Sequence, residues 1–313
     1  AAVPCAVEAL AEAEAYLRSR RVRLDRKQVL ELYMVMGGVP HYLRQVEPGR
    51  SAGQNVDRIC FTKDGLLVDE FDELYSSLFD RPEPYVEIVR LLARRRIGLT
   101  RTELLQQSGL RSGGNVTKIL DTLEQAGFIA SYVPFGRRSR EAVYRLVDEY
   151  SLFYLTWISR APRPGVTGGT ADYWLHVRQQ RPWQAWSGYS FEGICLKHIH
   201  QLKDGLGIRA VGTTESSWRA LPNEHDERGA QIDLLVDRQD RCINLCEMKY
   251  SDREFVITKR YAEELRNKRD TFRDRTRTSK TIMLVMVTTH GTRRNAYRDE
   301  LIADQLDMGH LFR

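Results

Sequence analysis

Cysteine is scarce in this chain, and its arrangement excludes two kinds of stabilising site. The five cysteines among 313 residues are an odd number, are widely scattered and form no C-x-x-C pair. Such a pattern indicates neither a disulfide framework nor a zinc knuckle. Unpaired cysteines are typical of a reducing compartment, so we expect a cytoplasmic protein.

Long apolar runs are also missing. No stretch of about 18 apolar residues occurs, so the sequence predicts no membrane-spanning helix. The apolar start AAVPCAVEAL has no basic leader before it, so we do not expect a signal peptide. The chain does not begin with Met, and we expect Ala1 to be an internal start, either of a cloned fragment or of a processed product.

Charged residues, by contrast, are plentiful. A content of 42% hydrophobic and 29% charged residues is typical of a globular protein, and the length predicts two or three domains. Lys and Arg outnumber Asp and Glu by 48 to 42, and they gather in basic segments at 18–23, 94–96, 137–140 and 259–280. One such segment is usually a solvated surface, but several in one chain favour an anionic partner such as nucleic acid.

Helix signals fill residues 1–80, for which we expect an all-α segment. Helices are predicted over residues 6–20, 25–36 and 65–79. Asp25 has the residue type of an N-cap, Gly37 and Gly38 end the second helix, and Pro40 is expected to keep the chain from resuming it. Two prolines directly after residue 80 mark a boundary.

The pattern changes over residues 81–160. Three short helices are predicted, the second capped by Thr100 and the third opening at Ser112, and two β-rich pieces, IASYVPF and AVYRLV, follow around the loop GRRSRE. An aromatic helix from about Glu149 closes the segment, and its rings are expected in a core or an interface. The order of helices and strands is that of a winged helix-turn-helix.

Two interpretations of this winged helix stay open. In the first, the third helix enters a DNA major groove and the loop arginines bind phosphates. In the second, the unit is a spacer that packs against its neighbours, which the acidic Asp121 and Glu124 on the same helix favour. The DNA-contacting residues of the first interpretation would be Ser112, Asn115, Lys118, Arg137, Arg138 and Arg140.

A Pro- and Gly-rich stretch, APRPGVTGGT, predicts a linker at residues 161–181. The last segment, residues 182–313, is predicted to be a compact α/β domain. Its expected helices are 190–201 and 258–272, and its expected strands are 208–213, 231–236, 243–249 and 281–288. His198 falls on the apolar side of the first helix and is expected to pack there, and His290 is expected in a turn.

Three residues in this α/β segment combine charge with apolar strands. Asp233 lies between Ile232 and Leu234, and Glu247 and Lys249 are two apart in the next strand, so they share one face. Charged groups on strands this apolar need partners, because burying an isolated charge is costly.

A register argument brings the two acids together. If the hairpin loop has an odd length and is centred on Asp240, Asp233 lies opposite Glu247 with Cβ atoms about 5 Å apart. A loop of even length would turn Glu247 to the other face. Two facing carboxylates suit Mg²⁺ or Mn²⁺, which would activate a water for attack on a phosphate, while Lys249 orients that water or stabilises the developing charge. Glu192, on the preceding helix, is expected to complete the acidic set.

Asp233 followed by Glu247-Met248-Lys249 resembles the D…(E)XK signature of the PD-(D/E)XK nucleases, and the helix around Phe191-Glu192 resembles the helix that supplies their extra Glu. Ile232 stands where the signature has Pro. The resemblance implies a restriction-endonuclease-like fold for residues 182–313. A salt-bridged strand pair without a metal is the structural alternative.

The resemblance extends over essentially the whole chain. The segments MGGVPHYLRQV (36–46), YRLVDEYSLFYLTW (144–157) and WSGYSFEGICLKHI (186–199) are similar in order and spacing to the C-terminal half of archaeal-type, DEXX-box AAA ATPases, which are related to the STAND NTPases. Residues 1–80 would then be the helical lid. No G-x-x-x-x-G-K-[ST] occurs, so we expect that an ATPase core lay upstream as a partner and that this chain does not hydrolyse ATP.

Two functions therefore remain in view. One is a metal-dependent DNA endonuclease, and the other is a non-catalytic DNA-binding or regulatory segment built on a nuclease-like fold. Basic residues on the helix after the Lys249 strand would hold the phosphate backbone in the first case and solubilise the helix in the second. They are Lys259, Arg260, Arg266 and Lys268. The oligomeric state is left open, with an oligomer possible.

Overall fold

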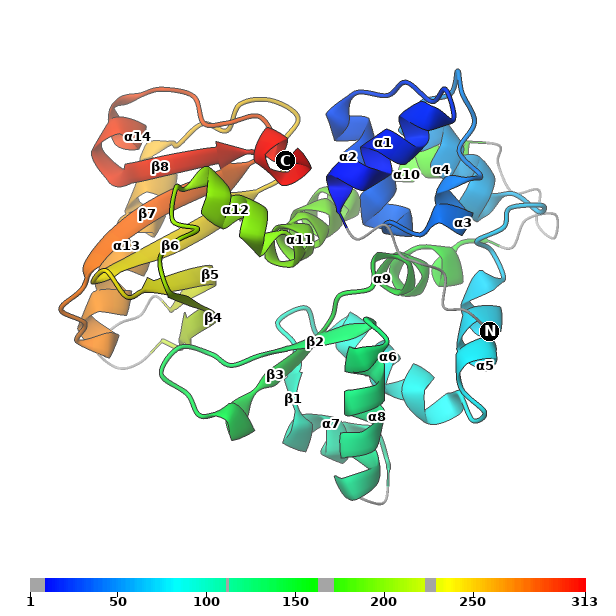
Figure 1. Ribbon diagram of the computed structural model, residues 1–313, viewed down its shortest axis with the longest axis horizontal. Coiled ribbons are helices and arrows are strands. Elements are labelled where there is room, and N and C mark those ends of the chain that lie inside the picture. Colours follow the sequence, from blue (N-terminus) through cyan, green and yellow to red (C-terminus); the bar gives the residue numbers. More distant parts are fainter. Residues whose placement is uncertain (1–8, 111–112, 163–171, 223–228) are drawn as a thin grey trace. The chain divides into compact units, whose positions relative to one another are not determined.

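The computed structural model describes residues 9–110, 113–162, 172–222 and 229–313 (Figure 1). The chain divides into two compact units. Unit 1 comprises Ala1–Ser131 and Ala142–Ser190, and unit 2 comprises Tyr132–Glu141 and Phe191–Arg313. The described residues form a mixed α/β structure with a three-stranded and a five-stranded sheet. None of the helices in these ranges has the length and apolar character needed to cross a membrane.

Short helices fill the first part of unit 1. They are α1 (Leu10–Ser19), α2 (Arg26–Met36), α3 (Pro40–Leu43), α4 (Ala52–Phe61) and α5 (Glu70–Leu78). The Asp25 side chain accepts the N–H of Gln28, which confirms the predicted cap, and α2 ends at Met36 as expected. The prediction for Pro40 was wrong, because Pro40 begins α3 at a position where a missing N–H costs nothing.

The second part of unit 1 combines helices with a small sheet. Its elements are α6 (Glu83–Arg94), β1 (Leu99–Thr100), α7 (Arg101–Gln107), α8 (Gly113–Gln125), β2 (Ile129–Tyr132), β3 (Val143–Leu146), α9 (Glu149–Thr156) and α10 (Tyr173–Val177). The sheet order is β1-β3-β2, and the short strand β1 was not predicted. Thr100 caps α7 as expected, with Glu103 completing a capping box. Ser112, the expected start of the third helix, lies outside the described residues.

Aromatic side chains form much of the core of unit 1. Tyr150 and Phe153 on α9 are fully buried, which confirms that this helix contributes to a core. The Phe153 ring meets Trp174 and Trp186 edge to face. Trp174 belongs to α10, so the segment 161–181 that was predicted as a linker holds a helix that packs into this core; its residues 163–171 lie outside the described ranges.

Unit 2 is built around the five-stranded sheet. Its elements are the second half of α11 (Arg181–Lys197), α12 (Ile199–Gly205), β4 (Thr213–Ala220), β5 (Ala230–Arg238), β6 (Cys242–Lys249), α13 (Lys259–Thr276), β7 (Thr281–Thr288), α14 (Ala296–Leu301), β8 (Ile302–Asp307) and a 3-10 turn (Met308–Phe312). Strands β4, β5 and β6 are antiparallel, whereas β6, β7 and β8 are parallel.

Most strand predictions in unit 2 are confirmed. Strands β5, β6 and β7 cover the expected segments, and α13 runs four residues past its predicted end. The strand predicted at 208–213 was wrong, because residues 208–212 form the turn between α12 and β4, with Ile208 buried, and β4 begins only at Thr213.

The sheet of unit 2 has helices on both of its faces (Figure 1). Ile243 and Leu245 of β6 belong to one buried cluster with Ala262, Leu265 and Phe272 of α13. The neighbouring residue Cys246 points to the opposite face, because side chains alternate along a strand. Glu247 and Lys249 therefore share the α13 face.

Candidate functional site

The β5–β6 hairpin has the register that the sequence predicted. Leu234 pairs with Cys246 and Asp237 pairs with Ile243, so paired residue numbers are symmetric about Asp240. The loop consists of Gln239, Asp240 and Arg241, with Arg241 in the left-handed region at φ 64°. This odd loop confirms the condition on which the candidate site depends.

Asp233 lies at an irregularity of the sheet. Between Ile232 and Leu235, strand β5 has two residues opposite the single residue Ser217 of β4, because Trp218 pairs with Ile232 and Ser216 pairs with Leu235. The extra residue makes a β-bulge, which changes the direction of the side chains around it. The regular β5–β6 pairing also stops at Leu234, one residue short of the predicted Asp233–Glu247 pair.

Glu247 is the centre of the candidate site. It is only 2% exposed, and three side chains contact its carboxylate. The Lys268 Nζ lies 2.5 Å from Oε1, the Tyr261 hydroxyl donates to Oε2 at 3.1 Å, and the Lys249 Nζ lies 3.7 Å from Oε2. A buried carboxylate needs such partners, and here they come from α13 and from its own strand.

Tyr261 links the two acids electrostatically. Burial raises the pKa of its phenol far above the usual value, and the charge and hydrogen bond of Glu247 and the charge of Asp233 raise that pKa further. Tyr261 is therefore a neutral hydrogen-bond donor in the physiological range. The contribution of Asp233 indicates that its carboxylate lies close enough to act on the same phenol.

Lys249 lies between this cluster and solvent. Its side chain is 32% exposed, and its Nζ lies 5.6 Å from the centre of the Tyr261 ring. In the parallel register, Lys249 pairs with Thr288 of β7, whose buried hydroxyl has no hydrogen-bond partner within the described ranges. The ammonium can thus be reached by a small polar ligand at the carboxyl end of two neighbouring strands.

Asp233 and Glu192 have different surroundings. Asp233 is 9% exposed and accepts a hydrogen bond from the Gln231 side chain at 3.0 Å. In the described part of the chain, no cation lies within ion-pair distance of Asp233. Glu192 is half-buried on α11, and its charge adds to the burial that raises the pKa of Cys195.

The donor chemistry of this cluster suits Mg²⁺ or Mn²⁺ only in part. Asp233 and Glu247 offer the carboxylate oxygens that such ions prefer, with waters completing the shell. Both oxygens of Glu247 are already in contact with protein groups, so Lys268 would have to turn away. In keeping with this, the described ranges contain no group of three or more His, Cys, Asp or Glu side chains arranged to hold a metal.

The residues expected to bind nucleic acid lie in separate segments. Lys118 is exposed on α8 in unit 1. Arg137, Arg138 and Arg140 are exposed in the β2–β3 loop, which belongs to unit 2, and Arg137 pairs with Glu141 at 3.1 Å.

The basic residues of α13 differ in their partners. Lys259 is exposed, and Arg260 pairs loosely with Glu264 at 3.4 Å. Arg266 pairs with Glu300, and Lys268 pairs with Glu247. These last two were grouped with the phosphate-binding residues, but both contact carboxylates of their own unit.

The sequence did not predict three contacts of the two acids, two from α13 and one from β5. Tyr261 and Lys268 are seven residues apart, which places them on one helix face two turns apart, and both reach Glu247. Gln231 lies two residues before Asp233 in the same strand. The spacing was visible in the sequence, but the direction of that helix face was not.

The two histidines behave as predicted. His198 is 1% exposed, and its Nδ1 hydrogen-bonds the Ile194 carbonyl at 2.9 Å. His290 precedes Gly291, which has φ 81°, in a turn after β7. Neither histidine joins the acidic cluster in the described structure.

Comparisons of this chain with protein-family models, with curated proteins and with solved structures find no match.

Proposed function

We propose that residues 182–313 form a PD-(D/E)XK nuclease-like domain that hydrolyses DNA phosphodiester bonds with Mg²⁺ or Mn²⁺. The observation that carries the proposal is the meeting of Lys249, Tyr261 and Lys268 on the buried carboxylate of Glu247, with Asp233 at a bulge on the adjacent strand. The hairpin register supports it, because a loop of even length would have turned Glu247 to the face opposite that of the Asp233 segment.

Each residue has a distinct role in this proposal. The metal ion, when bound, would polarise the scissile phosphate and lower the pKa of a bound water. Asp233 and Glu247 would hold it, and Tyr261 positions the Glu247 carboxylate by donating to Oε2. Lys249 orients the attacking water or stabilises charge on the phosphate, since its ammonium is the more exposed of the two that contact Glu247. Glu192 would complete the acidic set.

The rest of the chain fits the C-terminal half of an archaeal-type AAA ATPase. The order α6-β1-α7-α8-β2-β3 supports a winged helix at 81–160, and the helices α1 to α5 are compatible with a lid that follows an ATPase core. Cleavage in a cytoplasmic protein of this kind would be controlled by that core. Fold order alone does not assign function, so the site residues carry the argument.

One observation favours a second candidate, a non-catalytic DNA-binding or regulatory segment. Lys268 lies 2.5 Å from Glu247 and occupies an oxygen that a metal would need. If this ion pair is permanent, the acidic cluster is structural and the domain is an interaction platform.

Nicking of supercoiled plasmid in Mg²⁺ or Mn²⁺ separates the two candidates. We expect cleavage by the native chain and a loss of at least about a hundredfold in Asp233→Ala and Lys249→Ala. Asp237→Ala is the matched control, because it removes an acid from the same strand at the far end of the hairpin. Absent cleavage with equal DNA binding by all four proteins would favour the non-catalytic candidate.

A further inference from the structure

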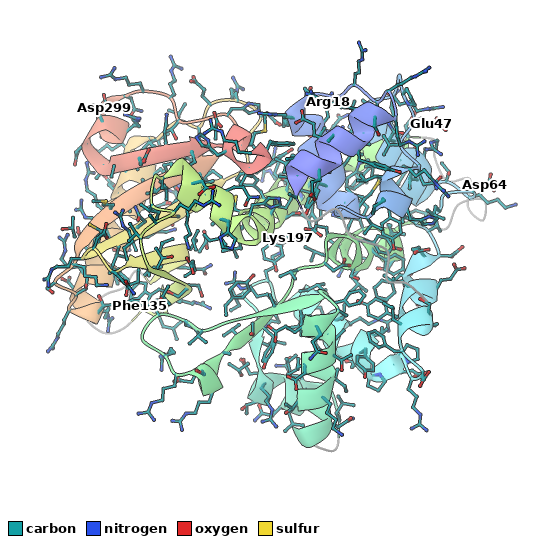
Figure 2. All side chains as sticks on the ribbon, viewed as in Figure 1. Arg18, Glu47, Asp64, Phe135, Lys197 and Asp299 are labelled. Atoms are coloured by element: carbon teal, nitrogen blue, oxygen red, sulfur yellow. The ribbon has the colours of Figure 1, made fainter. Side chains whose placement is uncertain are left out.

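The β2–β3 loop is anchored to the sheet of unit 2. The Phe135 N–H donates to the Ser217 carbonyl at 2.8 Å, and Ser217 is the β4 residue opposite the bulge that contains Asp233. The Phe135 ring, labelled in Figure 2, packs against Phe272 of α13 with ring centres 5.4 Å apart. Phe135 also contacts the buried cluster of this unit. The loop is thus held at two points of the sheet unit.

These two anchors bring together arginines that are far apart in the sequence. Arg137, Arg138 and Arg140 follow Phe135 in the loop, and Arg273, Arg275 and Arg277 follow Phe272 at the end of α13. All six are exposed, and the two stretches contain only two acids, Glu141 and Asp274. We name these six arginines the loop–α13 surface.

Most of these arginines have no acidic side chain within ion-pair distance among the described residues. Arg137 pairs with Glu141, but the other five arginines form no ion pair with the described residues. An excess of like charge on one surface destabilises the folded state slightly through repulsion, and an anionic partner would relieve that repulsion. Arginine is the side chain best suited to phosphate, because its planar fork donates two hydrogen bonds at once.

We propose that the loop–α13 surface binds the phosphate backbone of double-stranded DNA and delivers the duplex to the acidic cluster. This inference rests on the proposed function for the destination of the DNA, but not for the binding itself. Both anchoring elements also hold the cluster, since β4 opposes the Asp233 bulge and α13 carries Tyr261 and Lys268. Along α13, Arg273 and Arg275 lie about 8 and 11 Å beyond Lys268, which corresponds to about two to three phosphates of one strand.

The loop arginines therefore act with the sheet of unit 2. The sequence instead predicted that they bind phosphates as the wing of a winged helix whose third helix, with Lys118 in unit 1, enters the major groove. The two arrangements can be distinguished by experiment. If the loop arginines act with the sheet of unit 2, removing the Phe135 ring that anchors the loop should weaken DNA binding.

The test measures the salt dependence of binding to a 20-base-pair duplex by fluorescence anisotropy, in EDTA so that no cleavage is needed. Arg138→Ala/Arg140→Ala and Arg273→Ala/Arg275→Ala are each expected to weaken binding about tenfold and to reduce the slope of log K against log salt by about one to two. Phe135→Ala, which retains every arginine, is expected to weaken binding similarly. Arg209→Ala/Arg294→Ala removes the same charge from exposed residues elsewhere in unit 2 and should change the slope little. Thermal unfolding monitors folding in all variants.

The proposal is overturned if the α13 pair leaves the slope unchanged, or if the control pair lowers it as much as the two test pairs. Binding to phosphatidylserine vesicles without binding to the duplex would also overturn it. Plasmid nicking keeps the two proposals apart. If the slopes change as expected but no nicking occurs, the DNA-binding surface is supported and the nuclease proposal is refuted. If the slopes do not change but nicking is normal, only the DNA-binding surface is refuted.

Discussion

The β5–β6 hairpin carries acids and cations at both of its ends, and the two ends use them differently. Near the turn, Lys280 contacts Asp237 and Arg238 contacts Asp240. Each acid has one cation, and both acid side chains keep more than a quarter of their surface exposed. Such pairs stabilise the hairpin a little and require no functional explanation.

At the open end the same residue types are buried and unevenly matched. Glu247 is 2% exposed and is contacted by two ammonium groups and a phenol. Asp233 is 9% exposed and accepts a hydrogen bond from the side-chain amide of Gln231. Burying charges in this way costs free energy unless their partners are well placed. Burial and the number of partners, rather than residue type, therefore distinguish the candidate site from an ordinary surface salt bridge.

The largest expected effect on stability is a contrast between two single variants, Glu247→Ala at the open end and Asp237→Ala near the turn. Glu247→Ala should lower the free energy of unfolding by about 3 kcal/mol, because Lys268 is left partly buried without its carboxylate. Asp237→Ala should lower it by less than about 1 kcal/mol. Urea denaturation of both variants measures the contrast. Equal losses of unfolding free energy would mean that the two ends of the hairpin do not differ in how strongly their acids stabilise the fold.

A smaller effect is expected from Tyr261→Phe, which removes the hydroxyl that donates to Glu247 at 3.1 Å. A hydrogen bond to a buried charge contributes about 1.5 to 2 kcal/mol. Tyr297→Phe is the matched control, because the Tyr297 hydroxyl, on α14, forms no hydrogen bond with the described residues. Urea titrations that showed the same loss in both variants would remove Tyr261 from the site.

The sequence predicted the central strands because their signal is local. Residues 281–288 form an apolar run rich in β-branched residues, and residues 231–236 and 243–249 are mostly apolar with a few polar positions; β5, β6 and β7 match the three segments. Strand β4 was misplaced because TTESSWRA is polar, with Trp218 as its one large buried side chain. An edge strand of this kind has no apolar run to mark it.

The candidate site was predictable up to the hairpin and no further. The register that brings the Asp233 and Glu247 segments together follows from loop length and alternation, both of which are visible in the sequence. The bulge at Asp233 was not, since it depends on how β4 pairs with β5. The contact of Lys268 with Glu247 was missed for a similar reason, because the packing direction of α13 is a tertiary property.

Asp233→Asn is not expected to lower the free energy of unfolding, in contrast to Glu247→Ala. The neutral amide keeps an oxygen to accept from Gln231 while removing a buried charge, so the free energy of unfolding should stay equal or rise by about 1 kcal/mol. Titration calorimetry with Mn²⁺ should show weaker binding by the variant. A variant that is clearly less stable than the native chain would mean that Asp233 is structural, like Asp237.

The smallest expected effect is the pH dependence of the stability that Asp240 contributes near the turn. The hydrogen bond and charge of Arg238 lower the pKa of Asp240 below 3.8. A lowered folded-state pKa contributes stability that is present above the unfolded pKa and is lost as pH falls through the folded pKa. Asp240→Asn should therefore be slightly less stable than the native chain near pH 6, and this gap should close as pH falls through the folded-state pKa. Thermal unfolding across this range measures the gap, and a gap that does not change with pH would show that the Arg238 contact contributes no charge-dependent stability. Because Asp240 is exposed, the contact is screened by solvent, so losing this acid is expected to cost much less than losing the buried Glu247 at the open end.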